Sequence, residues 1–220
     1  MKNAMTGPEN IFEIIKAGDL SELQRMIEAD KSLAMSRDAA GVSALMTAAY
    51  YRRPDMVRLL RDTVSELDIF EAAALGDEQT LGQLIGNEDN ILSYSSDGFT
   101  PLHLAAFFNQ PGIVKILMDH CADVNAIAEN PGRVQALHSA TACGSTEIVK
   151  ILLEHGAEVN ARQHGGWTAL QAAAKHGNLE MVQLLLRHGA DPEQPADNGQ
   201  SALTLAADDS VRQLMETPGA

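Results

Sequence analysis

Apolar and polar positions between residues 97 and 126 follow a helical period. Thr100 is a good helix N-cap, and Pro101 suits the first turn, where its missing N–H costs nothing. These residues predict a short apolar helix over 102–108. Beyond the turn at 109–112, apolar side chains recur three and four residues apart, at Ile113, Val114, Ile116 and Leu117. The pattern predicts a second helix that packs antiparallel to the first.

This two-helix pattern recurs along the chain. Leucines in matching positions are spaced 35, 33 and 33 residues apart, at Leu102, Leu137, Leu170 and Leu203. A fixed period of this size is typical of a solenoid, in which each unit buries its apolar face on its neighbours. The second helix of two copies ends in His-Gly, which favours a left-handed cap at Gly156 and Gly189. Cys121 occupies the equivalent position, and we expect a locally altered helix end there because a β-carbon is strained in that conformation.

The N-terminal half contains weaker copies of the same pattern. Ile-Phe-Glu occurs at 11–13 and at 69–71, and the segment 41–49, with Ser43 as its N-cap, supplies a unit between them. From Leu45 to Ile69 is only 24 residues, so we expect the connection between those two units to lack its projecting turn. After a flexible N-terminus at 1–8, the sequence predicts one domain over 9–217. Its units lie near 9–37, 38–66, 67–94, 95–129, 130–162, 163–195 and 196–217.

The letters of these units resemble the ankyrin repeat. Asp-Gly-Phe-Thr-Pro-Leu-His-Leu-Ala-Ala begins at Asp97, and Ala-Asp-Val-Asn-Ala follows at 122–126. The match is specific from Asp97 to about Asp191 and weaker elsewhere. The resemblance implies an all-α ankyrin-repeat solenoid of about seven helix-turn-helix units, caps included, with short β-hairpin fingers. It also implies that the concave face and the fingertips bind other proteins.

Composition and charge narrow the class of partner. The formal net charge is −14, divided equally between 1–96 and 97–220. This argues against nucleic acid and anionic membrane, which require clustered Lys and Arg. The N-terminal segment has no apolar run of the length that a secretory signal needs. The two cysteines, Cys121 and Cys143, have no metal-like spacing. A cytoplasmic location with reduced thiols is therefore expected.

Motifs that would carry chemistry are not apparent in the sequence. Phosphate-loop, zinc-pair and dinucleotide fingerprints are missing, so we expect no catalytic residue, metal or cofactor. The position of His103 and His138 in the repeat resembles a structural hydrogen-bonding site. Cys143 and His176 fall on one face in adjacent units, and an enzyme or regulatory subunit that uses them is one alternative. Asn125 and Asn160 resemble asparagines that are hydroxylated in ankyrin proteins, and we interpret both as hairpin structure.

Aromatic residues break the repeat at particular positions. The first helix of each unit ends in a pair of residues that varies between units. These pairs are Tyr50-Tyr51, Phe107-Phe108, Ala142-Cys143 and Lys175-His176, and the first two are aromatic. Phe99 and Trp167 precede the next helix start, at the base of a finger. In ankyrin proteins these positions line the concave surface. Exposed aromatic patches mark binding sites, and Tyr, Trp and Arg are frequent hot-spot residues.

The sequence therefore predicts a non-enzymatic scaffold that binds an unidentified protein. Whether it would inhibit or escort an enzyme is left open by the sequence. Arg52 and Arg53 follow Tyr50-Tyr51 directly, and Arg133 ends a two-residue insertion in one fingertip. The predicted partner-binding residues are Tyr50, Tyr51, Arg52, Arg53, Phe99, Phe107, Phe108, Arg133, Trp167, Lys175 and His176. We expect a monomer. Self-association into a homodimer or larger homo-oligomer through the same patch is the other alternative.

Overall fold

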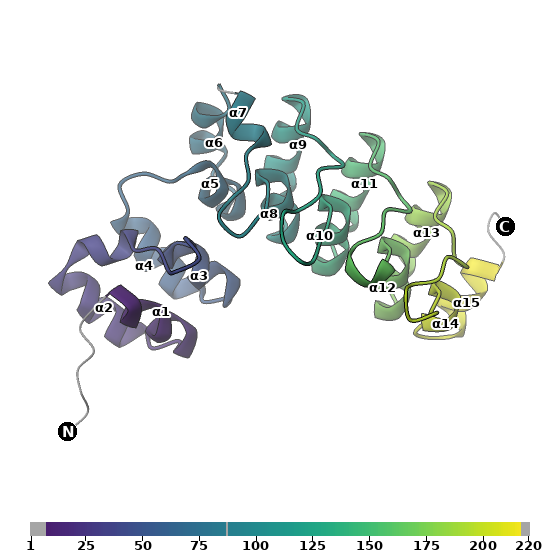
Figure 1. Cartoon of the computed structure of the whole chain (residues 1–220), viewed down its shortest axis with the longest axis horizontal. Helices are drawn as coiled ribbons and strands as arrows, with labels where there is room; N and C mark the ends of the chain where they lie inside the picture. The colour runs from purple at the N-terminus through teal and green to yellow at the C-terminus, as the bar shows by residue number, and fades with distance from the viewer. Residues whose placement is uncertain (1–7, 87, 217–220) are drawn as a thin grey trace. The chain divides into compact units, whose positions relative to one another are not determined.

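The computed structural model describes residues 8–86 and 88–216, and within them the chain is all-α (Figure 1). The first eight elements are α1 (Pro8–Ala17), α2 (Leu20–Ala29), the 3₁₀ helix η1 (Lys31–Met35), α3 (Ala44–Tyr50), α4 (Pro54–Thr63), α5 (Ile69–Leu75), α6 (Glu78–Leu84) and α7 (Glu88–Leu92). The remaining elements are α8 (Pro101–Phe107), α9 (Pro111–Asp119), α10 (Ala136–Cys143), α11 (Thr146–Glu154), the 3₁₀ helix η2 (His164–Gly166), α12 (Ala169–His176), α13 (Leu179–Arg187), α14 (Ala202–Leu205) and α15 (Asp209–Glu216). Short helices in sequential pairs confirm the predicted helical-repeat class.

The chain divides into two compact units, Met1–Glu71 and Ala72–Ala220, with the boundary inside α5. In unit 1, α1 packs on α2 and α3, and α4 packs on α2 and α3. Ser43 accepts a hydrogen bond from the Met46 N–H at 3.1 Å, which confirms it as the N-cap of α3. The expectation of one continuous domain over 9–217 stays a prediction.

In unit 2 the helices form two parallel rows (Figure 1). One row contains α8, α10, α12 and α14, and the other contains α9, α11, α13 and α15, with each helix packed on the next in its row. Three of the four leucines at the repeat position, Leu102, Leu137 and Leu170, are at most 2% exposed, and Leu203 in α14 is half-buried. Each of the three buried side chains contributes roughly 1.5–3 kcal/mol by leaving water. Small buried residues such as Ala105, Ala140 and Ala173 let neighbouring first helices approach closely.

Turns project between the helix pairs at the positions of the predicted fingers and are called fingers below, while their β-hairpin form stays a prediction. Each is closed by a backbone hydrogen bond, such as Ser95 N–H to Phe99 O and Ala128 N–H to Val134 O, both at 2.8 Å. The finger at 95–99 contacts the next one through Glu129 N–H, which donates to Gly98 O at 2.8 Å. A β-carbon on Gly98 would lie 2.6 Å from Glu129 O, so glycine is required there. Among the described residues the one β-bridge is isolated, between Arg37 and Ser43.

The end of α9 corrects one expectation. Cys121 has φ 59°, in the left-handed region. Its N–H donates to Met118 O at 3.1 Å, and the Ala122 N–H donates to Leu117 O at 3.0 Å. Gly156 and Ala157 make the same two bonds after α11. The predicted altered helix end is therefore wrong, because two backbone hydrogen bonds hold Cys121 in the conformation that glycine adopts elsewhere.

Candidate interaction surface

The aromatic residues singled out in unit 2 retain solvent access at the positions expected from the sequence. Phe107 ends α8 and is 41% exposed, while Phe99, Phe108 and Trp167 are half-buried. The rings are therefore partly packed against the stack and partly open to solvent. Such an arrangement limits the conformational entropy that a ring loses when a partner covers it.

Ring contacts show how finger bases and helix ends combine. The Lys175 Nζ lies 5.5 Å from the centroid of the Trp167 ring, in a cation–π geometry. Phe107 and Phe108 meet edge to face at 5.1 Å. Trp167 and Lys175 hold the same repeat positions as Phe99 and Phe107, so a finger base and the end of the following helix lie on one side of a unit. Phe99 itself lies 6.0 Å from the His103 ring.

In unit 1 the predicted residues differ in accessibility. Tyr51 is 48% exposed, and Tyr50 is half-buried. Arg52 is exposed and has φ 53° at the position where other units have glycine or asparagine. Arg53 is engaged inside the unit, because its guanidinium donates to the Lys16 backbone oxygen at 2.9 Å. Its partner-binding role stays a prediction, with the guanidinium less available than that of Arg52.

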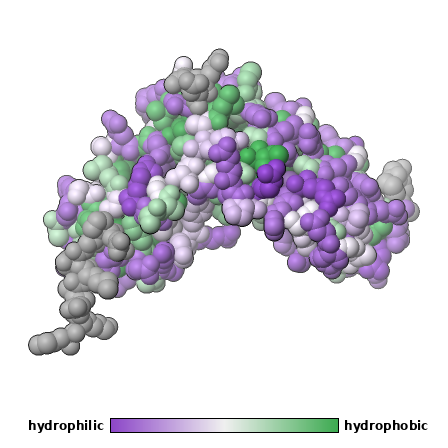
Figure 2. Space-filling model, in the orientation of Figure 1, coloured by the Kyte–Doolittle hydropathy of each residue, from purple (hydrophilic) through white to green (hydrophobic). Residues whose placement is uncertain are grey.

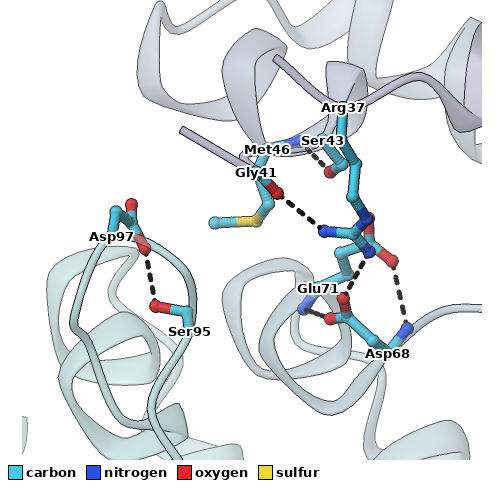
Figure 3. A network of polar contacts seen from close by, with 8 residues as sticks. All are labelled: Arg37, Gly41, Ser43, Met46, Asp68, Glu71, Ser95 and Asp97. Atoms are coloured by element: carbon cyan, nitrogen blue, oxygen red, sulfur yellow. Dashed lines mark hydrogen bonds and ion pairs between the residues drawn. The ribbon is translucent and has the colours of Figure 1, made fainter. Parts of the chain in front are cut away.

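A polar cluster closes unit 1 near the start of α5 (Figure 3). The Arg37 guanidinium donates to Gly41 O at 3.1 Å and to the Asp68 carboxylate at 2.9 Å. Asp68 and Glu71 cap each other reciprocally, since each backbone N–H donates to the other side chain. Only residues 64–68 separate α4 from α5. Arg37 thus connects the turn between η1 and α3, in which it lies, to this short segment between α4 and α5.

Arg133 is exposed at the tip of the inserted finger, where its φ is 48°. Backbone bonds hold this tip on both sides. Glu129 N–H donates to Gly98 O at 2.8 Å, and His164 N–H donates to Gly132 O at 2.9 Å. These two backbone bonds tie the inserted fingertip to the fingers on either side of it.

His103 and His138 are confirmed as structural hydrogen-bonding groups. The Thr100 N–H lies 3.2 Å from His103 Nδ1, and the Gln135 N–H lies 3.1 Å from His138 Nδ1. An N–H can only donate, so each Nδ1 accepts and each Nε2 carries the proton. The Nε2 groups then donate to Val134 O at 2.9 Å and to Ala161 O at 3.1 Å. Burial lowers the pKa of both imidazoles, which keeps them neutral.

Cys143 and His176 line one hollow of about 150 Å³ together with Asn178 and Met181. The Cys143 Sγ lies 3.2 Å from both Ala106 O and Ala140 O, so the thiol has carbonyl acceptors and no base within those contacts. Burial raises the pKa of this thiol. Both features disfavour the thiolate that a nucleophile requires.

We expect Cys143 to react at least about tenfold more slowly than Cys121 with a thiol reagent near neutral pH, because burial raises the pKa of the Cys143 thiol and limits access to it. Cys121 is exposed and acts as an internal reference. A Cys121→Gly variant leaves Cys143 alone, and glycine fits the left-handed position. Labelling rates followed by mass spectrometry check this expectation. Rapid labelling of Cys143 would instead support the enzyme alternative.

Two apolar residues on the fingers were missed by the sequence reasoning. Tyr94 is 36% exposed and Ile127 is 41% exposed. Each directly precedes the residue whose N–H closes its finger, Ser95 or Ala128. In Figure 2, apolar residues gather near the loop between α9 and α10. Aligning the fingers in the sequence could have identified both residues. Arg162 occupies the same position in the next finger, so Tyr94 and Ile127 are apolar at a position where another finger has a charged side chain.

The described residues include no group of three or more His, Cys, Asp or Glu side chains placed to hold a metal ion. No helix in that part of the chain is long and apolar enough to cross a membrane.

Paired short helices in rows, projecting turns and half-open rings on one side define a helical-repeat protein. A family model described as ankyrin repeats, in three copies, matches residues 69–163 and 160–220. The chain therefore belongs to the ankyrin-repeat family. Ankyrin repeats are in general protein–protein interaction modules, and the family is typically non-enzymatic.

Proposed function

We propose that this chain is a scaffold that binds another protein through the aromatic side of unit 2. The observation that carries the proposal is the exposure of Phe107 beside the half-buried Phe108. Phe99 and Trp167 extend the surface along the units, with Lys175, His176 and Arg133 at its border. In unit 1 the same proposal assigns Tyr50, Tyr51 and Arg52 to partner contact. Inhibition or escort of an enzyme would follow from occupying that partner's own functional surface.

The surface area of these rings is large enough to support the proposed interface. A fully covered aromatic ring buries ~150–250 Å². One side of a standard interface buries ~800 Å². Four partly open rings in unit 2 can therefore supply a substantial share of one side. Arg and aromatic side chains also dominate binding energy in measured interfaces.

Replacing Phe107, Phe108 and Trp167 together with alanine should abolish partner capture. Loss of even one hot-spot ring costs about 2 kcal/mol or more, which weakens binding about thirtyfold. The wild type and the triple variant are immobilised, exposed to lysate, and compared by quantitative mass spectrometry. Melting curves establish that the variant remains folded.

Leu179→Ala is the matched control, since Leu179 is 43% exposed at the start of α13 and is not among the proposed contact residues. The proposal requires proteins that the wild type and the Leu179→Ala control capture and the triple variant does not. Equal capture by the triple variant would overturn it. Light scattering over a dilution series identifies the case in which the captured partner is a second copy of the chain.

A further inference from the structure

The fingers of unit 2 carry an apolar patch that the aromatic pairs at the helix ends do not include. We call Tyr94 and Ile127 the finger patch. The two residues hold the same position in consecutive fingers, and those fingers are joined by the Glu129 N–H to Gly98 O bond. A second tie runs from the Asn130 side-chain amide to Asp97 O at 3.1 Å. Tyr94 and Ile127 therefore lie on adjoining, mutually fixed turns.

Two carboxylates, those of Asp123 and Glu129, act on Tyr94 in this patch. Desolvation raises the pKa of the Tyr94 phenol, and the nearby charges of Glu129 and Asp123 raise it further. Both carboxylates belong to exposed residues. The Asp123 carboxylate also accepts the Asn125 N–H at 3.0 Å, which fixes its position in the turn. An incoming side chain on the patch would therefore lie within reach of two negative charges.

The surrounding sequence offers few positive charges to offset them. Between residues 72 and 134 there are eight Asp and Glu residues and two basic residues, Lys115 and the fingertip residue Arg133. The Lys115 ammonium is paired with Glu147 at 2.9 Å. An acidic border around an apolar centre favours a partner of the opposite charge with apolar side chains of its own.

We propose that the finger patch docks a lysine- and arginine-rich segment of the partner, with an apolar side chain on Tyr94 and Ile127 and basic side chains beside Asp123 and Glu129. The inference rests on the proposed function and names the chemistry of the segment that the scaffold binds. Apolar contact supplies affinity, while the carboxylates accelerate encounter and select against acidic partners.

The test uses the full chain and three fluorescent twelve-residue peptides, which alternate Lys with Leu, Glu with Leu, or Lys with Ser. Fluorescence anisotropy should show the Lys/Leu peptide binding at least about tenfold more tightly than the Glu/Leu peptide. Its affinity should fall as salt rises, since exposed charges are screened. The Lys/Ser peptide should bind more weakly than the Lys/Leu peptide, because it lacks the apolar contact.

Variants separate this patch from the overall negative charge. Asp123→Asn with Glu129→Gln should weaken Lys/Leu binding about fivefold or more. Asparagine retains the acceptor for the Asn125 N–H, and the Glu129 backbone bond does not involve its side chain. Tyr94→Ser with Ile127→Ser should weaken binding to a similar extent. Glu154→Gln with Glu180→Gln removes two exposed carboxylates from second helices and should leave affinity within about twofold.

Equal loss in the Glu154/Glu180 control, or equal affinity for the Glu/Leu peptide, would overturn the inference. Its failure is distinguishable from failure of the proposed function. If finger-patch variants bind the peptide normally while the Phe107/Phe108/Trp167 variant loses its protein partner, the scaffold proposal stands and the basic-segment proposal falls.

Discussion

His103→Ala is expected to lower the free energy of unfolding by about 2–4 kcal/mol, whereas His103→Gln should cost less than about 1 kcal/mol. Alanine removes the acceptor for the buried Thr100 N–H and a donor to Val134 O. It also leaves a cavity where a ring that is 1% exposed had packed. Unpaired buried polar groups and cavities are among the largest single-residue costs.

Glutamine is a meaningful control because the chain already uses it in this role. Gln171 occupies the equivalent position of a later unit. Its Oε1 accepts the Thr168 N–H at 2.8 Å, and its Nε2 donates to Gln194 O and Gln200 O. Glutamine at 103 can therefore replace both polar functions of the imidazole.

Urea unfolding and thermal unfolding, both followed by circular dichroism at pH 7.5, check this expectation. The alanine variant should melt about 5–15 °C below wild type, given roughly 2–4 °C per kcal/mol for a chain of this size. Similar stability of the alanine and glutamine variants would contradict the structural role assigned to His103.

The second expected result is a loss of stability as pH falls below about 6.5, the usual pKa of histidine. Burial holds the pKa of His103 and His138 below that value in the folded state. The unfolded chain therefore binds more protons in that window, and acid favours it. Protonation would also place a hydrogen on each Nδ1, opposite the N–H that it must accept.

Each pKa unit of depression corresponds to about 1.4 kcal/mol of stability that is present above the unfolded pKa and lost as pH falls through the folded pKa. The double variant His103→Gln with His138→Gln should flatten the dependence between about pH 6.5 and pH 5, because amides do not titrate there. Urea midpoints at half-unit pH steps measure the difference. An unchanged slope in the double variant would show that other groups control this transition.

Much of the fold could be predicted from sequence because its determinants are local. N-caps such as Thr100 and Ser43 act within three residues of themselves, and the apolar positions of each helix recur at i, i+3 and i+4. The period of 33 to 35 residues then indicated stacked units, and the family match confirmed their type. The candidate site was less predictable, because exposure depends on how neighbouring units stack.

Particular residues show which features follow from neighbouring residues in the sequence and which depend on tertiary packing. The sequence by itself determined the helical repeat, the histidines in structural positions and the aromatic residues that interrupt the period. Only the tertiary structure decided that Arg53 binds the Lys16 carbonyl and that Tyr94 and Ile127 stay open to solvent. The physical reason is the sequence separation of the groups that determine each feature. Helix caps and periodicity are set within a few residues, whereas exposure and capping between units depend on groups more than thirty residues apart that approach only when the units pack.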